Sequence, residues 1–465
     1  MPSSHDDDHD QLMSGTSAGY EAPWERAFNR VLSPFEEFIR NQAAGGVVLL
    51  FSALCALALA NSPVFHAYET VLHTQLALRI GPWELSKSLH HWINDGLMTL
   101  FFFLVGLEIK GEVLVGSLAT VRQAALPAIA AVGGVLVPAL IYAVMNPAGI
   151  AARGWGIPMA TDIAFAVGAL VLLGGRVPKG LMTFLVALAI VDDLIAVLVI
   201  ALFYTEKISV LYLIIAALLY VVLITFNRGG IRAPLPYFVV GTLLWLAMLK
   251  SGVHATIAGV LLATAIPARP SYDPDRFSGH VRELMDRFDQ WGEGKKSILA
   301  SAGKHSILQT LENGVHLVET PLQRLEHTLQ RPVALLIMPI FALANAGVAL
   351  EGGHLGDLLS DPVVLGVTVA LVAGKFIGIS GFSWLALRLG IGQLPRGTTF
   401  QHLIGVGLLG GIGFTMSIFI SELAFGGSPH NLMAAKTGIL AASVIAGTLG
   451  FFWLRYVGRK RPHQH

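Results

Sequence analysis

The sequence has little charge and almost no cysteine. Charged residues make up 13% of the 465 residues and hydrophobic residues 54%, whereas about 25% of a typical soluble domain is charged. This shortage of charge excludes an ordinary soluble domain and indicates a polytopic membrane protein. The one cysteine, Cys55, excludes a disulfide framework, and its position in an apolar run indicates a packing role. A net charge of +1 gives no reason to expect nucleic-acid binding, and we expect no bound cofactor.

Long apolar runs predict twelve transmembrane helices, each close to the ~20 residues that cross a bilayer. The expected fold class is therefore an all-α polytopic membrane protein. Eight spans fall within 43–267 and four within 331–455. The predicted spans are 43–61, 93–116, 125–145, 155–173, 181–203, 208–226, 234–250, 252–267, 331–349, 362–386, 402–421 and 433–455.

Basic residues orient these spans, because short cytoplasmic loops attract lysine and arginine. With both termini in the cytoplasm, Lys375 lies within a span and most of the other basic residues lie inside. The basic residues of the outer loops are then Arg79, Lys87, Arg153, Lys207, Lys250 and Lys436. We therefore predict cytoplasmic termini. The start of the chain lacks the basic-then-apolar order of a cleaved signal peptide.

Segments outside the spans are few. We predict a cytoplasmic tail over 1–42 that includes an interfacial helix, a cytoplasmic loop over 268–330 and a short cytoplasmic tail over 456–465. The loop is either a passive connector or a regulatory element. Alternating residues on both sides of a Gly-Pro turn predict a small outer β-hairpin at about 75–87.

Two adjacent aspartates, Asp192 and Asp193, lie in the middle of the apolar run 181–203. A carboxylate at membrane depth costs at least ~2.5 kcal/mol on insertion scales, so such residues are usually functional. The pair therefore predicts an ion or proton site. The simpler alternative is a buried salt bridge that only fixes helix packing.

Two other spans look interrupted. Glycine and proline surround Thr161 and Asp162 in the fourth span, and the eleventh contains the glycine-rich segment 405–413. These patterns predict two broken, crossing helices in inverted repeats, with the site where the breaks meet. Asp162 would offset the positive N-terminal ends of the half-helices, and Lys375 the negative C-terminal ends.

The two aspartates cannot share one role. Neighbouring side chains on a helix point about 100° apart, so Asp192 and Asp193 do not hold one small ion symmetrically. A carboxylate paired with Lys375 stays ionised more easily, whereas an unpaired, desolvated one binds a proton more readily. Oxygen ligands without thiols or imidazoles favour Na⁺ or Li⁺. Because the cation needs a deprotonated carboxylate, Na⁺ and H⁺ compete, which suffices for exchange under alternating access.

The remaining ionisable groups at membrane depth allow two interpretations each. Asp95 opens the second span, where a helix N-terminus favours an anion. Glu108 and Lys110 lie at the inner end of that span, where they either extend towards water or serve a function. His254 opens a short span and is either a packing residue or a sensor.

These residues lie in motifs that resemble the NhaA-type sodium/proton antiporters of bacterial inner membranes. The similarity runs from about residue 43 to 455. The motifs are Trp92-Ile93-Asn94-Asp95, Phe103-Leu104-Val105-Gly106-Leu107-Glu108, Ala160-Thr161-Asp162-Ile163-Ala164-Phe165, Leu188-Ala189-Ile190-Val191-Asp192-Asp193-Leu194, Gly252-Val253-His254-Ala255-Thr256, Gly374-Lys375 and Gly411-Ile412-Gly413-Phe414-Thr415-Met416-Ser417.

The resemblance implies a transporter, not an enzyme, with Asp193 as the principal Na⁺ and proton carrier. Asp192 would pair with Lys375 in the inward-facing, proton-bound state. The implied exchange is electrogenic, moves more protons in than Na⁺ out and is activated at alkaline pH. The resemblance also implies a homodimer joined partly through the outer hairpin at about 75–87. At the crossing of the broken helices the resemblance places Thr161, Asp162, Gly411 and Gly413. It places pH-response residues at Glu108, Glu112, His254, Arg324, Glu326 and His327, with Asp95 as a possible pathway residue.

The chain departs from the family pattern near the predicted pH-response residues. Gly111 stands where well-studied members have arginine, and Gln323 replaces a basic residue beside Arg324. The loop 268–330 is also longer. We therefore expect an intact transport core and an altered pH profile.

Three rival functions remain open on the sequence. An intramembrane aspartyl protease also uses two buried carboxylates, but they must face each other from separate helices. A bile-acid-type sodium symporter would need a cavity for an organic substrate. A passive channel would show no counterflow of protons.

Overall fold

The computed structural model describes residues 43–80, 83–116, 118–205, 208–269, 274–290, 306–311, 314, 319–349 and 360–458. The described chain is mostly helical and contains one two-stranded sheet. The interfacial helix predicted within 1–42 lies outside these residues, as do much of the loop 268–330 and the tail beyond Gly458.

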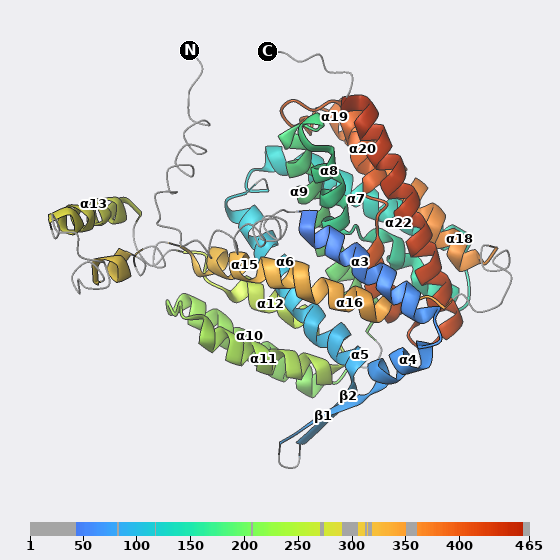
Figure 1. Ribbon diagram of the computed structural model, residues 1–465, viewed down its shortest axis with the longest axis horizontal. Helices are drawn as coiled ribbons and strands as arrows, with labels where there is room; N and C mark the ends of the chain where they lie inside the picture. The colour runs from blue at the N-terminus through green and yellow to red at the C-terminus, as the bar shows by residue number, and fades with distance from the viewer. Residues whose placement is uncertain are drawn as a thin grey trace, which may run out of the picture.

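The first half of the chain, up to α12, forms most of the helices in Figure 1. The α-helices are α3 (Ala43–Ala60), α4 (Phe65–His73), α5 (Leu89–His91), α6 (Met98–Leu114), α7 (Val121–Met145), α8 (Ile163–Leu173), α9 (Lys179–Phe203), α10 (Val210–Arg228), α11 (Pro234–Ser251) and α12 (Ile257–Ala265). The irregular helical segments are the π-helical η1 (Trp92–Leu97) and the 3₁₀-helical η2 (Ala151–Met159) and η3 (Gly174–Arg176).

The second half is built in the same way. Its α-helices are α13 (Pro274–Gln290), α15 (Pro321–Pro332), α16 (Met338–Asn345), α18 (Pro362–Val369), α19 (Lys375–Arg388), α20 (Phe400–Leu409), α21 (Phe414–Phe425) and α22 (Pro429–Gly458). The π-helical η5 (Val333–Ile337) joins α15 to α16, and η6 (Ala370–Gly374) joins α18 to α19. The Thr320 side chain caps α15 by accepting a hydrogen bond from the Gln323 amide.

A multi-pass helical membrane protein is confirmed, but the count of twelve spans stays a prediction. Within the described residues, eight helices are long and apolar enough to cross a membrane, or up to ten if each of two bent pairs is one span. The predicted span 252–267 holds only the nine residues of α12. Gly252 ends α11 with a φ of +84°, and the turn that follows uses up the rest of that apolar run.

The helices pack around two hydrophobic cores. The smaller core joins α10, α11 and α12 to one side of α6 through residues such as Leu107, Leu223 and Leu244. The larger core holds most of the other helices together, including α7, α9 and α19–α22. Helix α6 contributes to both cores, so it connects the two groups of helices.

A predicted β-hairpin marks one end of the molecule. β1 (Gln75–Ile80) pairs antiparallel with β2 (Trp83–Ser88), and Gln75 lies opposite Ser88. Figure 1 shows this hairpin next to α4 and α5, whereas α15 and the C-terminal end of α22 lie away from it. We call these two regions the hairpin end and the opposite end.

The close crossing of α7 and α19 depends on two glycines. Gly133 of α7 and Gly378 of α19 face each other so closely that a Cβ atom on either would overlap the backbone of the other. Glycine permits this approach because it has no side chain. The contact holds α19, whose first residue is Lys375, against α7.

We predict that Gly378→Ala destabilises the protein by about 1–3 kcal/mol, because the new methyl group has no space at the crossing. Thermal unfolding of the purified protein in detergent measures the effect. Gly381→Ala is the matched control, since Gly381 lies on the same helix with no neighbouring atom within 4 Å. That control should be neutral or slightly stabilising, and equal losses in the two variants would contradict the prediction.

Candidate functional site

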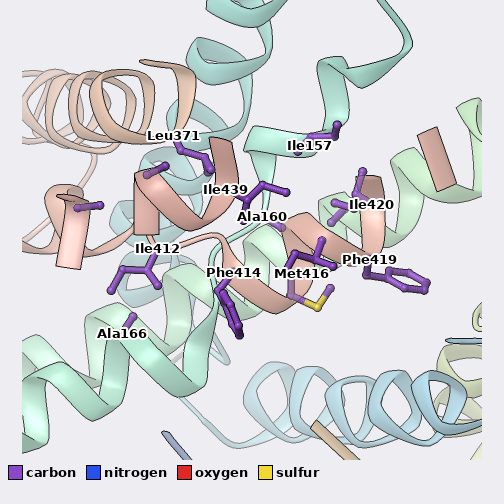
Figure 2. Close-up of a cluster of buried hydrophobic side chains, with 14 of the residues drawn as sticks. Ile157, Ala160, Ala166, Leu371, Ile412, Phe414, Met416, Phe419, Ile420 and Ile439 are labelled. Carbon is purple, nitrogen blue, oxygen red and sulfur yellow. The ribbon is translucent and has the colours of Figure 1, made fainter. Parts of the chain in front are cut away.

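Two broken spans cross in the middle of the larger core. In the first, η2 is followed by extended residues 160–162 and then by α8. In the second, residues 410–413 separate α20 from α21, and the two helices are bent by 46°. Hydrogen bonds join the breaks, from the Asp162 amide to the Ile412 carbonyl at 2.7 Å and from the Ser417 hydroxyl to the Ile157 carbonyl at 2.8 Å. Figure 2 shows the apolar side chains around this crossing.

The buried Asp162 carboxylate caps both half-helices that start at the crossing. Its Oδ1 accepts a hydrogen bond from the Phe165 amide of α8 at 3.2 Å. Its Oδ2 accepts one from the Thr415 amide of α21 at 3.0 Å, and a second from the Thr415 hydroxyl. A carboxylate is stable there because both helix N-termini carry partial positive charge and free amide donors.

Asp192 is held by a lysine and a threonine. Its Oδ2 atom lies 2.5 Å from the Lys375 Nζ atom, and both side chains are fully buried. The Thr161 hydroxyl lies 2.8 Å from the same oxygen and 3.0 Å from the carbonyl oxygen of Gly410. These contacts tie α9 to α19 and to both broken spans.

Asp193 has a different environment, although it is the next residue of α9. Its side chain is fully buried, and neither carboxyl oxygen has a hydrogen-bond partner among the described residues. It faces a cavity of about 820 Å³ that Asp162 and Thr415 also line. A buried carboxyl group without partners is costly, and in this position its free oxygens face a space that a small ion can enter.

The cavity extends from Asp193 towards the opposite end of the molecule. Its walls come from α3, α6, α9, α15 and the two half-helices α8 and α21. Four of the predicted pH-response residues line the part of the cavity towards the opposite end, namely Glu108, Glu112, Glu326 and His327. Gly111 and Gln323, where the chain departs from the family pattern, line it as well.

The other predicted site residues do not line the cavity. Gly411 and Gly413 form the break between α20 and α21, and Arg324 lies on α15. His254 lies between α11 and α12, with its Nε2 atom 3.2 Å from the Tyr204 carbonyl oxygen. Asp95 does not open its helix, because the helix begins at Leu89 behind a Ser88 cap and Asp95 sits in η1.

Sequence reasoning missed Thr415 as a site residue. Its amide and its hydroxyl both bind Asp162, which is 253 residues away in the sequence. The signal was its position at the start of the second half-helix, where free amide donors need an acceptor. Sequence reasoning also missed the structural role of Lys110. Its Nζ atom donates to the Thr264 carbonyl at 2.6 Å and so caps the C-terminal end of α12.

Comparison with known proteins places the chain in a family. The family model described as Na⁺/H⁺ antiporter 1 matches residues 36–454. The chain belongs to the Na⁺/H⁺ antiporter 1 family. The members of this NhaA family are transporters, not enzymes.

Individual relatives in the Na⁺/H⁺ antiporter 1 family are similar over nearly their whole length. The Na(+)/H(+) antiporter NhaA 1 of Saccharophagus degradans is 53% identical over 94% of this chain and 94% of its own. The Na(+)/H(+) antiporter NhaA of Sulfurimonas denitrificans is 52% identical over 94% of this chain and 98% of its own. That of Dichelobacter nodosus is 50% identical over 94% of both chains.

We predict that Thr415→Val destabilises the protein by about 1.5–3 kcal/mol, because Asp162 loses one of its charge-assisted hydrogen bonds. Thr415→Ser keeps the hydroxyl and should lose much less. Thr437→Val is the control, since among the described residues the Thr437 hydroxyl donates to a carbonyl of its own helix, that of Met433. Thermal unfolding in detergent compares the three variants, and a valine variant no less stable than the serine variant would count against the role of this bond.

Proposed function

We propose that this protein exchanges Na⁺ or Li⁺ for protons across a membrane. The observation that carries the proposal is the difference between two adjacent aspartates. Asp192 is bound to Lys375 and Thr161, whereas Asp193 faces the cavity with neither oxygen hydrogen-bonded among the described residues. The family membership supports the same function, since the relatives carry the name Na(+)/H(+) antiporter.

Competition at Asp193 accounts for the exchange. The carboxyl group binds either a proton or a cation, because a cation needs the ionised form. Asp162 and Thr415, which line the cavity with Asp193, carry oxygen atoms. Oxygen ligands suit Na⁺ and Li⁺. Each turnover then carries a cation one way and protons the other as the site alternates between the two sides.

Lys375 acts in this scheme as the counter-charge that switches. In the arrangement described here its ammonium group neutralises Asp192. A cation that binds at Asp193 recruits the neighbouring Asp192 and weakens that ion pair, so Lys375 loses a partner and releases a proton. The protons that leave Asp193 and Lys375 then outnumber the bound cation. Each turnover therefore moves net charge, and the exchange is electrogenic.

The rival functions fit the geometry less well. An aspartyl protease needs two carboxyl groups that share a proton, whereas Asp192 is bound to a lysine. A sodium symporter for an organic substrate is disfavoured by the family, since the relatives carry the name Na(+)/H(+) antiporter.

The orientation and regulation follow from the same proposal. The cavity opens to the cytoplasmic side of a bacterial inner membrane, both termini are cytoplasmic, and the hairpin end faces outwards.

Glu108, Glu112, Glu326 and His327 at the cavity mouth set the local charge that cations meet, so they tune the pH response. β1 and β2 form an isolated two-stranded sheet, and its free edges join two copies into a homodimer.

We predict that Asp193→Asn abolishes exchange, because asparagine neither releases a proton nor supplies a charged ligand. In everted vesicles with an acid interior, Na⁺ should cause dequenching of a pH-gradient dye in the parent protein and none in the variant. Thr183→Ala, on an exposed position of the same helix, should behave like the parent. Normal dequenching in Asp193→Asn would remove the central assignment.

We predict that Lys375→Ala weakens Na⁺-driven exchange and shifts its pH dependence, because Asp192 is left buried without its counter-charge. The measurement is the Na⁺ concentration for half-maximal dequenching across a series of pH values. Lys179→Ala removes an exposed lysine from the start of α9 and serves as the control. An unchanged Na⁺ and pH profile in Lys375→Ala would show that the ion pair has no part in transport.

A further inference from the structure

The cavity ends at a cluster of three phenylalanines on its hairpin side. Phe102 of α6 and Phe341 of α16 pack against Phe419 of α21, with ring centroids 5.5 Å and 6.2 Å apart, and each side chain is at most 1% exposed. On α16 and α21 the cavity lining stops at Met338 and Met416, one turn before Phe341 and Phe419. We call Phe102, Phe341 and Phe419 the aromatic cluster.

A polar cluster lies one turn beyond the aromatic cluster. Asn345 follows Phe341 on α16, and Glu422 follows Phe419 on α21, both at helical spacing. Glu422 Oε1 lies 2.6 Å from Lys436 Nζ of α22 and 3.9 Å from His90 Nε2 of α5. Asn345 lies 2.9 Å from His90 and exchanges hydrogen bonds with Asn94 of η1 at 2.8 Å and 3.2 Å. We call these five residues the polar cluster.

Both clusters hold one short helix in place. Helix α21 carries Thr415 at the Asp162 site, then Phe419, then Glu422. The break at residues 410–413 precedes it and already bends the chain by 46°. If α21 swings at this break, it moves the site and both clusters together.

The ion pair in the polar cluster is not needed for packing. The Glu422 and Lys436 side chains are 11% and 12% exposed, and a largely buried ion pair gains little over apolar side chains of similar size. Its specific feature is that it can break and re-form. It is placed where α21 meets α5, α16 and α22, at the end that the cavity does not reach.

We propose that the polar cluster and the aromatic cluster form the outer gate of the transporter. The Glu422–Lys436 pair and the Asn94–Asn345–His90 contacts keep α21 closed against α5, η1, α16 and α22 while the cavity opens to the opposite end. Exposing Asp193 to the outside requires these contacts to break. This inference rests on the proposed exchange function, because only alternating access needs a second gate.

The test measures access to the site from each side. Met416→Cys, in a Cys55→Ser background, places a thiol on the cavity wall next to the aromatic cluster, where Figure 2 shows Met416 and Phe419 on the same helix. A small, membrane-impermeant thiol reagent is applied to right-side-out and to everted vesicles. We expect fast labelling in everted vesicles and slow labelling in right-side-out vesicles.

Loss of the ion pair should shift this balance towards the outside. In Glu422→Gln and in Lys436→Met we expect about tenfold faster labelling from the outside and slower labelling from the inside. Opposite changes on the two sides distinguish a gate from a loosened structure, which would be labelled faster from both. Lys250→Met, which removes another lysine predicted to face outwards, is the matched control.

Two further results decide the proposal. The reversed pair Glu422→Lys with Lys436→Glu should restore slow outside labelling and shows that the single variants fail through the lost pair, not through misfolding. Outside labelling that stays at the control rate, or that rises together with inside labelling, would overturn the gate. Na⁺-induced dequenching in vesicles that carry the parent protein tests the proposed exchange separately, since labelling does not require transport.

Discussion

The cost of burying charge is the constraint on which the rest of the structure depends. Asp162, Asp192, Asp193 and Lys375 are all fully or almost fully buried in the middle of a mainly apolar protein. Water does not solvate ionised groups there, so protein dipoles and counter-charges must stabilise them. Asp162 receives two helix N-termini and Asp192 receives Lys375. Neither oxygen of Asp193 has a hydrogen-bond partner among the described residues, and this carboxyl group faces the cavity.

Broken helices meet this constraint with backbone groups, which need no additional polar side chains. An unbroken helix uses all of its internal amide groups on itself, whereas each break frees donors and acceptors at membrane depth. The freed donors of one break form hydrogen bonds with the freed acceptors of the other, as the bond from the Asp162 amide to the Ile412 carbonyl shows. The Thr161 hydroxyl joins the Gly410 carbonyl to Asp192 in the same way. The crossing is therefore a polar site made mainly of backbone.

The sequence identifies residues that are unusual for their surroundings, and it misses contacts set by the crossing. Asp192 and Asp193 stand out because their span is apolar, and the breaks stand out because of their glycines. Lys375 follows by elimination, as the one cation predicted within a span. Thr415 does not stand out, because its role depends on a partner 253 residues away. The predicted span 252–267 also begins before α12 (Ile257–Ala265), since the turn after Gly252 interrupts an apolar run without changing its composition.

The adjacency of the two aspartates couples the proposed switch, Asp192 with Lys375, to the proposed carrier, Asp193. Both lie on the rigid helix α9, so a movement of Asp192 towards or away from Lys375 displaces Asp193 relative to the cavity. The same movement strains the Thr161 contact and, through Gly410, the break before α21. Helix α21 starts beside Asp162 and ends beyond the aromatic cluster. In the proposed exchange, a change of charge at Asp193 would therefore reach the hairpin end of the protein along α21, without any need for a separate relay.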